Sequence, residues 1–320
     1  MNAARSSTAT GTIATAKATR PAPATPLRGR FAPSPTGPLH AGSLLAAVGS
    51  YLDARAMGGE WLVRIEDVDR QREVPGAADE ILRTLERFGL QWDGAVVRQS
   101  ERGAWYAEAL AQLARADLSY PCSCARADLE AATGGRETRY PGHCRAAPRR
   151  PGAALAVRLR THAAPPVTIV DRLQAALTQS VEDSVGDFVL RRRDGFYAYQ
   201  LAVVVDDAAQ GITDVVRGLD LYDNSPRQWL LQRALGLPAV RYLHLPLVVD
   251  SNGEKLSKSR RALPVGVAEI PATLGVVLAW LGHPPPASLS GAPAAEQLEW
   301  AALNWNINNL HGVTELISSS

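Results

Sequence analysis

Apolar positions follow strand-like and helix-like spacings in turn over the first third of the chain. Residues 30–32 (RFA) predict a short strand, and apolar positions at helical spacing predict a helix over about 40–57, which ends at two glycines. Residues 61–66 (WLVRIE) predict the next strand, and residues 75–88 predict a helix that begins at a proline and is followed by a glycine. Because strands and helices alternate, we expect an α/β fold with a parallel sheet and right-handed crossovers.

The regular alternation stops near residue 100. A predicted helix over about 101–116 leads into a segment rich in glycine, arginine and proline that extends to about residue 152. The strand-like runs that follow are residues 154–159, 167–170 and 188–191. We interpret the region from about 100 to 190 as an insertion in the alternating domain.

Alternation resumes in the last third of the chain, although one element stays undecided. Residues 199–205 fit a helix or a strand equally well. Residues 212–217 and 242–249 predict strands, and an Asn-Ser-Pro sequence begins a predicted helix over 224–235. Residues 260–320 predict helices with a loose tail.

Composition adds limits on location and partners. Residues 1–29 hold no acidic residue and little that could form a core, so we expect a disordered tail there and consider a transit peptide the weaker reading. No apolar run is long enough for a membrane span and no secretory segment is visible, so we expect a cytoplasmic protein without membrane contact. A net charge of +2 does not by itself indicate a nucleic-acid partner.

The chain has 31 arginines but only three lysines, and two of these lysines, Lys255 and Lys258, stand three residues apart. Lysine carries a compact, flexible point charge, whereas the guanidinium group of arginine is a planar fork. Where arginine is the usual basic residue, this pair predicts a site that needs point charges. The alternative is chance clustering.

A second candidate site lies at 30–43 (RFAPSPTGPLHAGS), where prolines and glycines precede the predicted helix. The first turn of a helix offers free N–H groups and a partial positive charge, so it can bind phosphate. His40 and Gly42 at this junction fit a nucleotide site, because the imidazole can donate and glycine allows close approach. The alternative is a histidine that only caps the helix.

Three cysteines give a third candidate site. Cys122 and Cys124 are followed by Tyr140, His143 and Cys144. Close cysteines of this kind are typical of a structural zinc site, and three thiolates require a fourth ligand, for which histidine is the ordinary choice. The alternative is three free, buried cysteines without a metal.

Together these motifs resemble the class I aminoacyl-tRNA synthetases, whose two signatures stand here as HAGS (40–43) and KLSKS (255–259). The sequences RFAPSPTG (30–37), RIEDVD (64–69) and VVRG (215–218) are similar to the glutamate branch. The resemblance covers about residues 28–260. Ser43 replaces the second histidine of the first signature, which puts its own part in phosphate binding in question.

The resemblance implies a role for each matching residue. Arg30 and Arg217 bind the substrate carboxylate, Glu66 binds its ammonium group, and Tyr199 with Phe31, Ala32, Pro33 and Ser34 completes the glutamate pocket. The residues implied for ATP are His40, Gly42, Ser43 and Lys258, and those implied for catalysis are His40, Lys255 and Lys258. In one subfamily the zinc pattern is C-x-C…Y-x-x-x-C, so we prefer Tyr140 to His143 as the fourth ligand of one structural Zn²⁺.

Only about 60 residues follow Ser259, too few for the anticodon-reading domains of a full glutamate enzyme. We therefore expect a Rossmann-like catalytic domain over 30–260 and a small helical region over 261–320 with no anticodon-binding domain. The chain is similar to a shortened subfamily that uses ATP and Mg²⁺ to activate L-glutamate and transfers it to queuosine in the anticodon stem-loop of tRNA(Asp). The resemblance implies a ligase, and we expect a monomer.

Two other functions stay open at this stage. One is a truncated glutamate enzyme that acts on the acceptor end of tRNA. The other is a catalytically silent, synthetase-like RNA-binding module.

Overall fold

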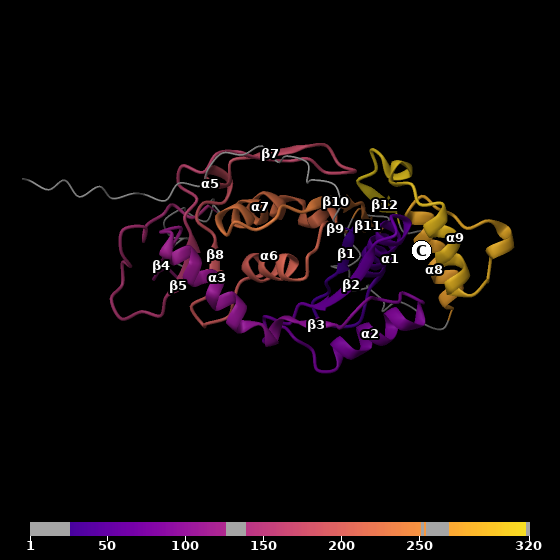
Figure 1. Ribbon diagram of the computed structural model, residues 1–320, viewed down its shortest axis with the longest axis horizontal. Helices are drawn as coiled ribbons and strands as arrows, with labels where there is room; N and C mark the ends of the chain where they lie inside the picture. Colours follow the sequence, from indigo (N-terminus) through magenta and orange to yellow (C-terminus); the bar gives the residue numbers. More distant parts are fainter. Residues whose placement is uncertain (1–25, 126–138, 251–252, 254–268, 318–320) are drawn as a thin grey trace, which may run out of the picture.

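The computed structural model describes residues 26–125, 139–250, 253 and 269–317. The molecule is longer than it is wide, with parallel strands at its centre (Figure 1). The inserted strands β4, β5 and β8 lie toward one end, and the helices α8 and α9 lie at the other. Among the described residues, no helix combines the length and apolar content needed to cross a bilayer.

The central parallel strands are β1 (Arg28–Phe31), β2 (Glu60–Ile65), β3 (Val97–Arg98), β9 (Asp214–Gly218) and β10 (Arg241–Leu245). β2 pairs with β1 and β3, and β9 pairs with β10, in parallel register throughout. β1 and β9 lie side by side, and the backbone N–H of Thr213 donates to the carbonyl of Arg28 at 2.9 Å. The order β3-β2-β1-β9-β10 confirms the predicted parallel sheet.

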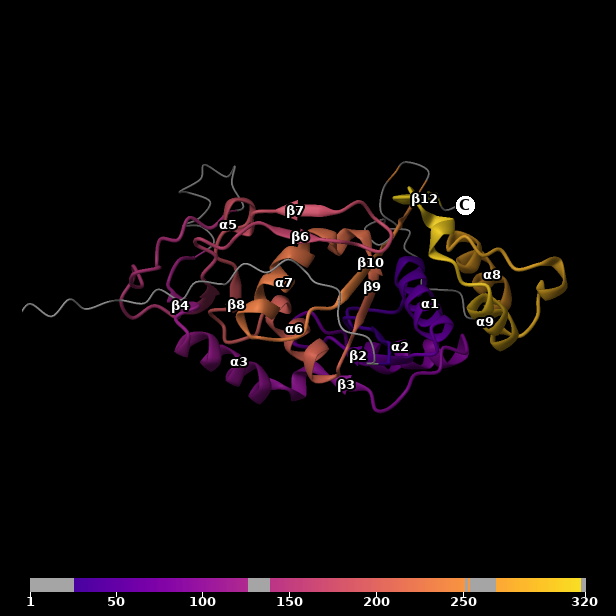
Figure 2. The same cartoon turned by 45° about the horizontal axis from the view of Figure 1, so that its top comes forward.

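Helices cover both faces of these strands, which makes two hydrophobic cores. The helices concerned are α1 (Ala41–Ala56), α2 (Ala77–Arg87), α3 (Gly103–Arg115), α6 (Tyr199–Ala209) and α7 (Ser225–Ala234). Val216 and Leu243 pack in the core of α1, whereas their neighbours Val215 and Tyr242 pack in the core of α6 and α7. Figures 1 and 2 accordingly show α1 on one side of β9 and α6 on the other.

The undecided segment 199–205 is helical and forms the start of α6. Residues 200–207 are all buried, so this helix has no polar face that would reveal its period in the sequence. Its acidic residues Asp206 and Asp207 are also buried and bind basic side chains. A helix that is enclosed on all sides cannot be distinguished from a buried strand by its pattern alone.

The inserted region is mostly antiparallel. β5 (Ala156–Leu159) lies between β4 (Ser119–Cys122) and β8 (Val189–Arg191), and a hairpin of β6 (Val167–Ile169) and β7 (Leu177–Gln179) precedes the short helix α5 (Val181–Ser184). The strands β4 and β7 were not predicted. β4 is a short edge strand that contains a proline, and β7 has only three residues, so neither shows a clear period.

Three predictions are wrong, one about a strand and two about the tails of the chain. The strand predicted over 242–249 divides at Pro246, which has no N–H for a ladder bond, into β10 and β11 (Leu247–Val249). β11 pairs in parallel with β12 (Glu315–Ile317), so the tail is not loose there. The tail expected over 1–29 is also too long, because Leu27 is buried and β1 begins at Arg28.

The C-terminal helices α8 (Ile270–Trp280) and α9 (Ala294–Leu303) pack on α1 and extend its core. Short 3-10 turns complete the described chain at Gln99–Glu101, Leu219–Asn224, Ala287–Leu289 and Ile307–Leu310. The expected helical region after residue 260 is therefore present over the described part of 269–317, with β12 as an addition.

Candidate active site and metal cluster

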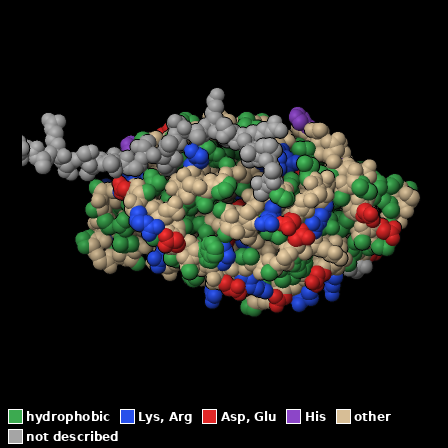
Figure 3. All heavy atoms as spheres, in the orientation of Figure 1, with side chains coloured by type: hydrophobic (Ala, Val, Ile, Leu, Met, Phe, Trp, Pro, Cys, Tyr) green, Lys and Arg blue, Asp and Glu red, His purple; other side chains and the backbone are tan. Residues whose placement is uncertain are grey.

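Charged side chains of both signs are interspersed over the face drawn in Figure 3, so no single-signed patch marks a site on it. The notable charges are buried. Arg64 of β2, Arg30 of β1, Arg217 of β9 and His244 of β10 are 0%, 3%, 5% and 0% exposed. The residue before or after each of them packs in the α1 core, so these basic side chains take the opposite face, toward α6.

Two carboxylates neutralise part of the positive charge of this row of basic side chains on β2, β1, β9 and β10. Asp207 of α6 lies 2.8 Å from Arg64 and 3.3 Å from Arg30, and Glu66 lies 3.2 Å from Arg64. Burial opposes ionisation of Asp207, but Arg64 and Arg30 outweigh it and hold the pKa of Asp207 below its usual value. Burial dominates for Glu66, whose pKa is raised although Arg64 and Arg30 lie nearby.

Arg217 differs from the other two arginines, because no described carboxylate lies within ion-pair distance of it. Its Nε donates to His244 Nε2 at 3.0 Å, and Nη1 donates to Gln228 Oε1 at 2.8 Å. Nη2 donates to Ser225 Oγ at 2.9 Å and to the carbonyl of Leu221 at 3.2 Å. The buried guanidinium is thus held by neutral partners. One of its two Nη1 hydrogens has no acceptor among the described residues.

Tyr199 lies close to the same charged side chains. Burial raises the pKa of its phenol, and Arg217, Glu66 and Arg30 are the charges that act on it. The structure therefore brings together the three side chains predicted to bind the carboxylate and ammonium groups of a substrate with Tyr199, which was predicted to line the same pocket.

Not every predicted pocket residue offers a side chain to this space. The Phe31 ring lies in the α1 core, stacked on Trp61 with 6.4 Å between ring centroids. Pro33 is buried and accepts a hydrogen bond from the backbone of Glu66 at 2.8 Å, whereas Ser34 is exposed and Ala32 is half-buried. Phe31 can thus contribute only backbone groups to this space.

His40 is the N-cap of α1, at the helix start where both the nucleotide-site prediction and the capping alternative place it. Its Nδ1 accepts the backbone N–H of Ser43 at 3.2 Å, and Ser43 Oγ lies 3.0 Å from its Nε2. A Cβ on Gly42 would come within 3.3 Å of the His40 ring, so glycine allows this ring position. Lys255 and Lys258 lie outside the described residues.

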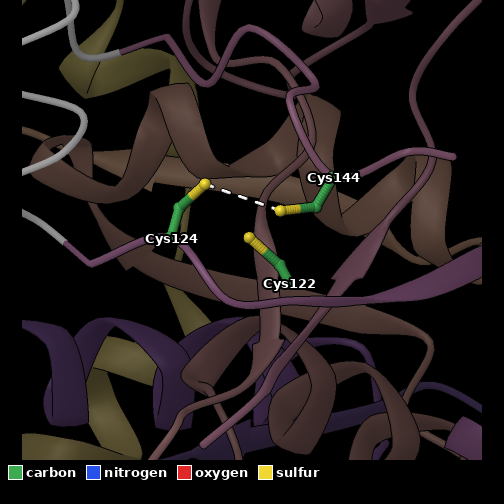
Figure 4. Close-up of side chains that lie close together, drawn as sticks. All are labelled: Cys122, Cys124 and Cys144. Atoms are coloured by element: carbon green, nitrogen blue, oxygen red, sulfur yellow. Dashed lines mark hydrogen bonds between the residues drawn. The ribbon is translucent and has the colours of Figure 1, made fainter. Parts of the chain in front are cut away.

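The three cysteines form a cluster whose sulfur atoms all lie within 4.8 Å of one another (Figure 4). Cys124 Sγ and Cys144 Sγ are 3.6 Å apart. The Tyr140 hydroxyl joins them, at 3.2 Å from Cys122 Sγ and 3.7 Å from Cys124 Sγ. His143 has no hydrogen bond to any of these sulfurs, and its Nε2 is buried without a hydrogen-bond partner.

These distances fit a tetrahedral metal ion. Zinc–sulfur bonds of about 2.3 Å place neighbouring ligand atoms about 3.8 Å apart in a tetrahedron. The Arg158 guanidinium lies 3.8 Å from the Tyr140 ring centroid, and its Nε donates to Cys122 Sγ at 3.3 Å, which favours negative charge on this cluster. The residues could therefore hold a metal.

Four further residues of this site were not predicted from the sequence. Asp207, Arg64, Gln228 and His244 are all buried next to the predicted side chains. Arg64 stands within the RIEDVD sequence, and Asp207 ends an apolar run, so both carried a local signal. His244 and Gln228 had none, because their roles depend on contacts between distant segments.

Comparisons with known proteins agree with this geometry. Residues 26–271 match the family model described as tRNA synthetases class I (E and Q), catalytic domain, and the chain belongs to this family. It is therefore a ligase of the aminoacyl-tRNA synthetase class, and the class I synthetase fold expected from the motifs is confirmed.

More specific similarity comes from individual relatives. The chain is 54% identical over 282 residues to the glutamyl-Q tRNA(Asp) synthetase of Pseudomonas aeruginosa (strain LESB58), covering 88% of this chain and 94% of the relative. It is 53% identical over 284 residues to the protein of the same name from Thiobacillus denitrificans, with the same coverage. The crystal structure of glutamate-tRNA synthetase from Elizabethkingia anophelis matches 91% of this chain and 68% of that chain, with a TM-score of 0.76 and 26% identity. These findings support an activity of the glutamate–tRNA ligase type.

Proposed function

We propose that this protein activates L-glutamate with ATP and Mg²⁺ to glutamyl-adenylate and transfers the glutamyl group to queuosine in the anticodon stem-loop of tRNA(Asp). The queuosine part of this proposal is taken from the names of the relatives. The glutamate part rests on one feature of the pocket, the buried Arg217.

Arg217 supports a dicarboxylic substrate, because its charge lacks a direct counter-ion. Burying a cation without an anion costs several kcal/mol. An ionised carboxylate of the substrate would supply the missing negative charge. An amide side chain could accept the free Nη1 hydrogen but would not neutralise the charge, so the pocket favours glutamate over glutamine. Glu66 at the other side of the row would take the substrate ammonium group, with Arg30 between them.

In the proposed reaction the protein positions groups and balances charge. The α-carboxylate of glutamate attacks the α-phosphorus of ATP, and pyrophosphate leaves with the electron pair of the broken P–O bond. His40, Gly42, Ser43 and the first turn of α1 would face the nucleotide phosphates, as helix N-termini do. Lys255 and Lys258 would stabilise the leaving pyrophosphate. A hydroxyl of the queuosine cyclopentenediol would then attack the adenylate carbonyl to form an ester, AMP would leave with the electron pair of the broken C–O bond, and the hydroxyl proton would pass to water.

The cysteine cluster would hold one structural Zn²⁺, with Cys122, Cys124, Cys144 and Tyr140 as ligands. The support is the Tyr140 hydroxyl, which contacts two sulfurs where His143 contacts none. Four protein ligands would close the coordination shell, so the ion would stabilise the insertion and take no part in the transfer.

The test uses two assays on the full chain. Glutamate-dependent ATP–pyrophosphate exchange measures adenylate formation, and radiolabelled glutamate measures transfer. Three RNAs separate the possible acceptors: an isolated anticodon stem-loop of tRNA(Asp) with queuosine, the same stem-loop without it, and full-length tRNA(Glu).

We expect exchange, and label only on the queuosine-containing stem-loop, which has no acceptor end. Label on tRNA(Glu) alone would contradict the proposal in favour of a truncated acceptor-end enzyme. No exchange from folded, zinc-containing protein would contradict it in favour of a silent RNA-binding module.

A further inference from the structure

Arg217 is linked to a second buried acid through His244. The imidazole Nε2 lies 3.0 Å from Arg217 Nε, and its Nδ1 lies 2.6 Å from Asp171 Oδ2. The His244 and Asp171 side chains are both 0% exposed. Arg217 and His244 are also register partners on the neighbouring strands β9 and β10.

The contacts fix where the imidazole proton lies. The Nε of an arginine can only donate, so His244 Nε2 must accept, and a neutral imidazole then carries its hydrogen on Nδ1. That hydrogen is donated to Asp171, whose other oxygen accepts the backbone N–H groups of Leu173 and Gln174 at 2.9 Å each. Asp171 therefore acts as an acceptor on both oxygens and selects a single tautomer of His244.

The residues around this link favour the same arrangement. Burial lowers the pKa of His244 against the opposing effect of Asp171, so the imidazole stays neutral at pH 7. Burial also opposes ionisation of Asp171, but the hydrogen bonds from His244 and the Gln174 backbone hold its pKa below the usual value. A neutral imidazole adds no second positive charge beside Arg217, whose guanidinium keeps its full charge for a ligand.

Asp171 belongs to the inserted region, between β6 and β7, and so comes from outside the central strands. The backbone N–H of Arg172 donates to the carbonyl of Tyr242 at 2.9 Å, and Gln174 Nε2 donates to the carbonyl of His244 at 2.8 Å. These bonds hold residues 171–174 against β10. The insertion thus reaches the pocket of the catalytic domain through this segment.

We propose that Asp171 and His244 are positioning residues, which orient the Arg217 guanidinium so that its free Nη1 hydrogen and its charge face the side-chain carboxylate of glutamate. This inference rests on the proposed function of Arg217. Neither residue needs to touch the substrate. Their effect passes through one hydrogen bond, from Arg217 Nε to His244 Nε2, which restricts rotation of the guanidinium plane.

Asp171→Asn is the sharpest test, because it keeps the size and shape of the side chain while it removes the charge and reverses the proton pattern toward His244. Asparagine can still accept the backbone N–H groups of Leu173 and Gln174, but it presents an amide N–H to His244 Nδ1. The imidazole must then carry its hydrogen on Nε2, where it opposes the N–H of Arg217. His244→Asn breaks the same contact from the other side, since it can still donate to Asp171 but offers no acceptor to Arg217.

The insertion provides a matched control. His162 Nδ1 lies 2.9 Å from Glu182 Oε1, but His162 is 70% exposed and the pair has no contact with the pocket. Glu182→Gln therefore removes a carboxylate–histidine contact of similar length without affecting Arg217. Three quantities are measured: glutamate-dependent exchange at varied concentrations of glutamate and of ATP, the thermal unfolding temperature, and the ¹⁵N chemical shifts of the histidine rings. The signal that is missing in His244→Asn identifies His244.

For Asp171→Asn and His244→Asn we expect the KM for glutamate to rise by about tenfold or more, the effect of one hydrogen bond to a charged group. The KM for ATP should stay within about twofold, since the nucleotide contacts are separate. The His244 shifts of Asp171→Asn should move from the Nδ1–H to the Nε2–H form, and Glu182→Gln should match the wild type.

Two results would overturn the positioning role. One is a wild-type KM for glutamate in Asp171→Asn despite the changed tautomer. The other is an equal rise in both KM values together with a lower unfolding temperature, which a purely structural role would give. Arg217→Ala tests the proposed glutamate binding separately from the positioning role. If Arg217→Ala abolishes exchange while Asp171→Asn does not alter it, only the positioning role fails. Unchanged exchange in Arg217→Ala would instead refute the glutamate assignment.

Discussion

Replacing Asp207 by asparagine removes the anion that two buried arginines share. The Asp207 side chain is 6% exposed, and its Oδ1 lies 2.8 Å from Arg64 and 3.3 Å from Arg30. Removing one partner of a buried ion pair typically costs about 3–5 kcal/mol of unfolding free energy. We expect about 3 kcal/mol here, the lower end, because Arg64 keeps its contacts with Glu66 at 3.2 Å and Gln210 at 2.7 Å. At about 2–4 °C per kcal/mol, the unfolding temperature should fall by roughly 6–12 °C.

The assay is urea unfolding and thermal unfolding of Asp207→Asn beside Asp79→Asn. Asp79 pairs with Arg98 at 3.0 Å, but its carboxylate is 63% exposed, so the same chemical change should cost at most about 1 kcal/mol. The slope of the free energy against urea should match the wild type in both variants, because neither alters the surface exposed on unfolding.

The pH dependence gives an independent check on Asp207. Its pKa in the folded protein is below the unfolded value, so the stability that it contributes is present above the unfolded pKa, about 3.9. That contribution is lost as the pH falls through the lower folded pKa. The difference between wild type and Asp207→Asn should therefore stay constant from pH 8 to about 5 and shrink only below about 4. Equal losses in Asp207→Asn and Asp79→Asn at pH 7 would refute the argument from burial.

The remaining predictions concern other side chains of the pocket and the cluster. Burial raises the pKa of Glu66 in the folded protein, so stability falls as the pH rises from the unfolded pKa, about 4.3, toward the raised folded value. Glu66→Gln removes this loss and should raise the unfolding temperature at pH 7, whereas glutamate-dependent exchange should fall by about tenfold or more. Tyr140→Phe should weaken zinc binding by roughly tenfold, measured in competition with a chelator, whereas His143→Ala should leave zinc affinity within about twofold of the wild type. The reverse order of these effects would identify His143 as the ligand. Gly42→Ala should raise the KM for ATP several-fold without altering the KM for glutamate, because the added Cβ would lie 3.3 Å from the His40 ring. An unchanged KM for ATP would place the nucleotide elsewhere.

Local patterns predicted the elements that have one buried face or a clear start and end. Helix α1 ends at two glycines and α7 begins at Asn-Ser-Pro, and both lie where the pattern indicates. Helix α6 stayed undecided because it is buried on all sides. β11 was merged with β10 although Pro246 stands between them, and the partner strand β12 that distinguishes β11 lies far away in the sequence. Pairing between distant segments leaves no periodic signal in either one.

The pocket could be predicted only in part for the same reason. The motifs indicated Arg30, Glu66 and Arg217, because these stand within short recognisable sequences. The contact between Arg217 and His244 depends on the register of β9 against β10, and the contact between His244 and Asp171 depends on how the insertion docks. Neither follows from the spacing of residues along the chain.

The pairing of β12 with β11 has a practical consequence for anyone who prepares this protein. β12 ends at Ile317 and pairs with β11, the strand that precedes the sequence with Lys255 and Lys258. A bulky group attached directly after β12 would crowd this two-stranded joint. A failed exchange reaction with such an attachment would not test the proposed chemistry, so a purification tag belongs away from β12.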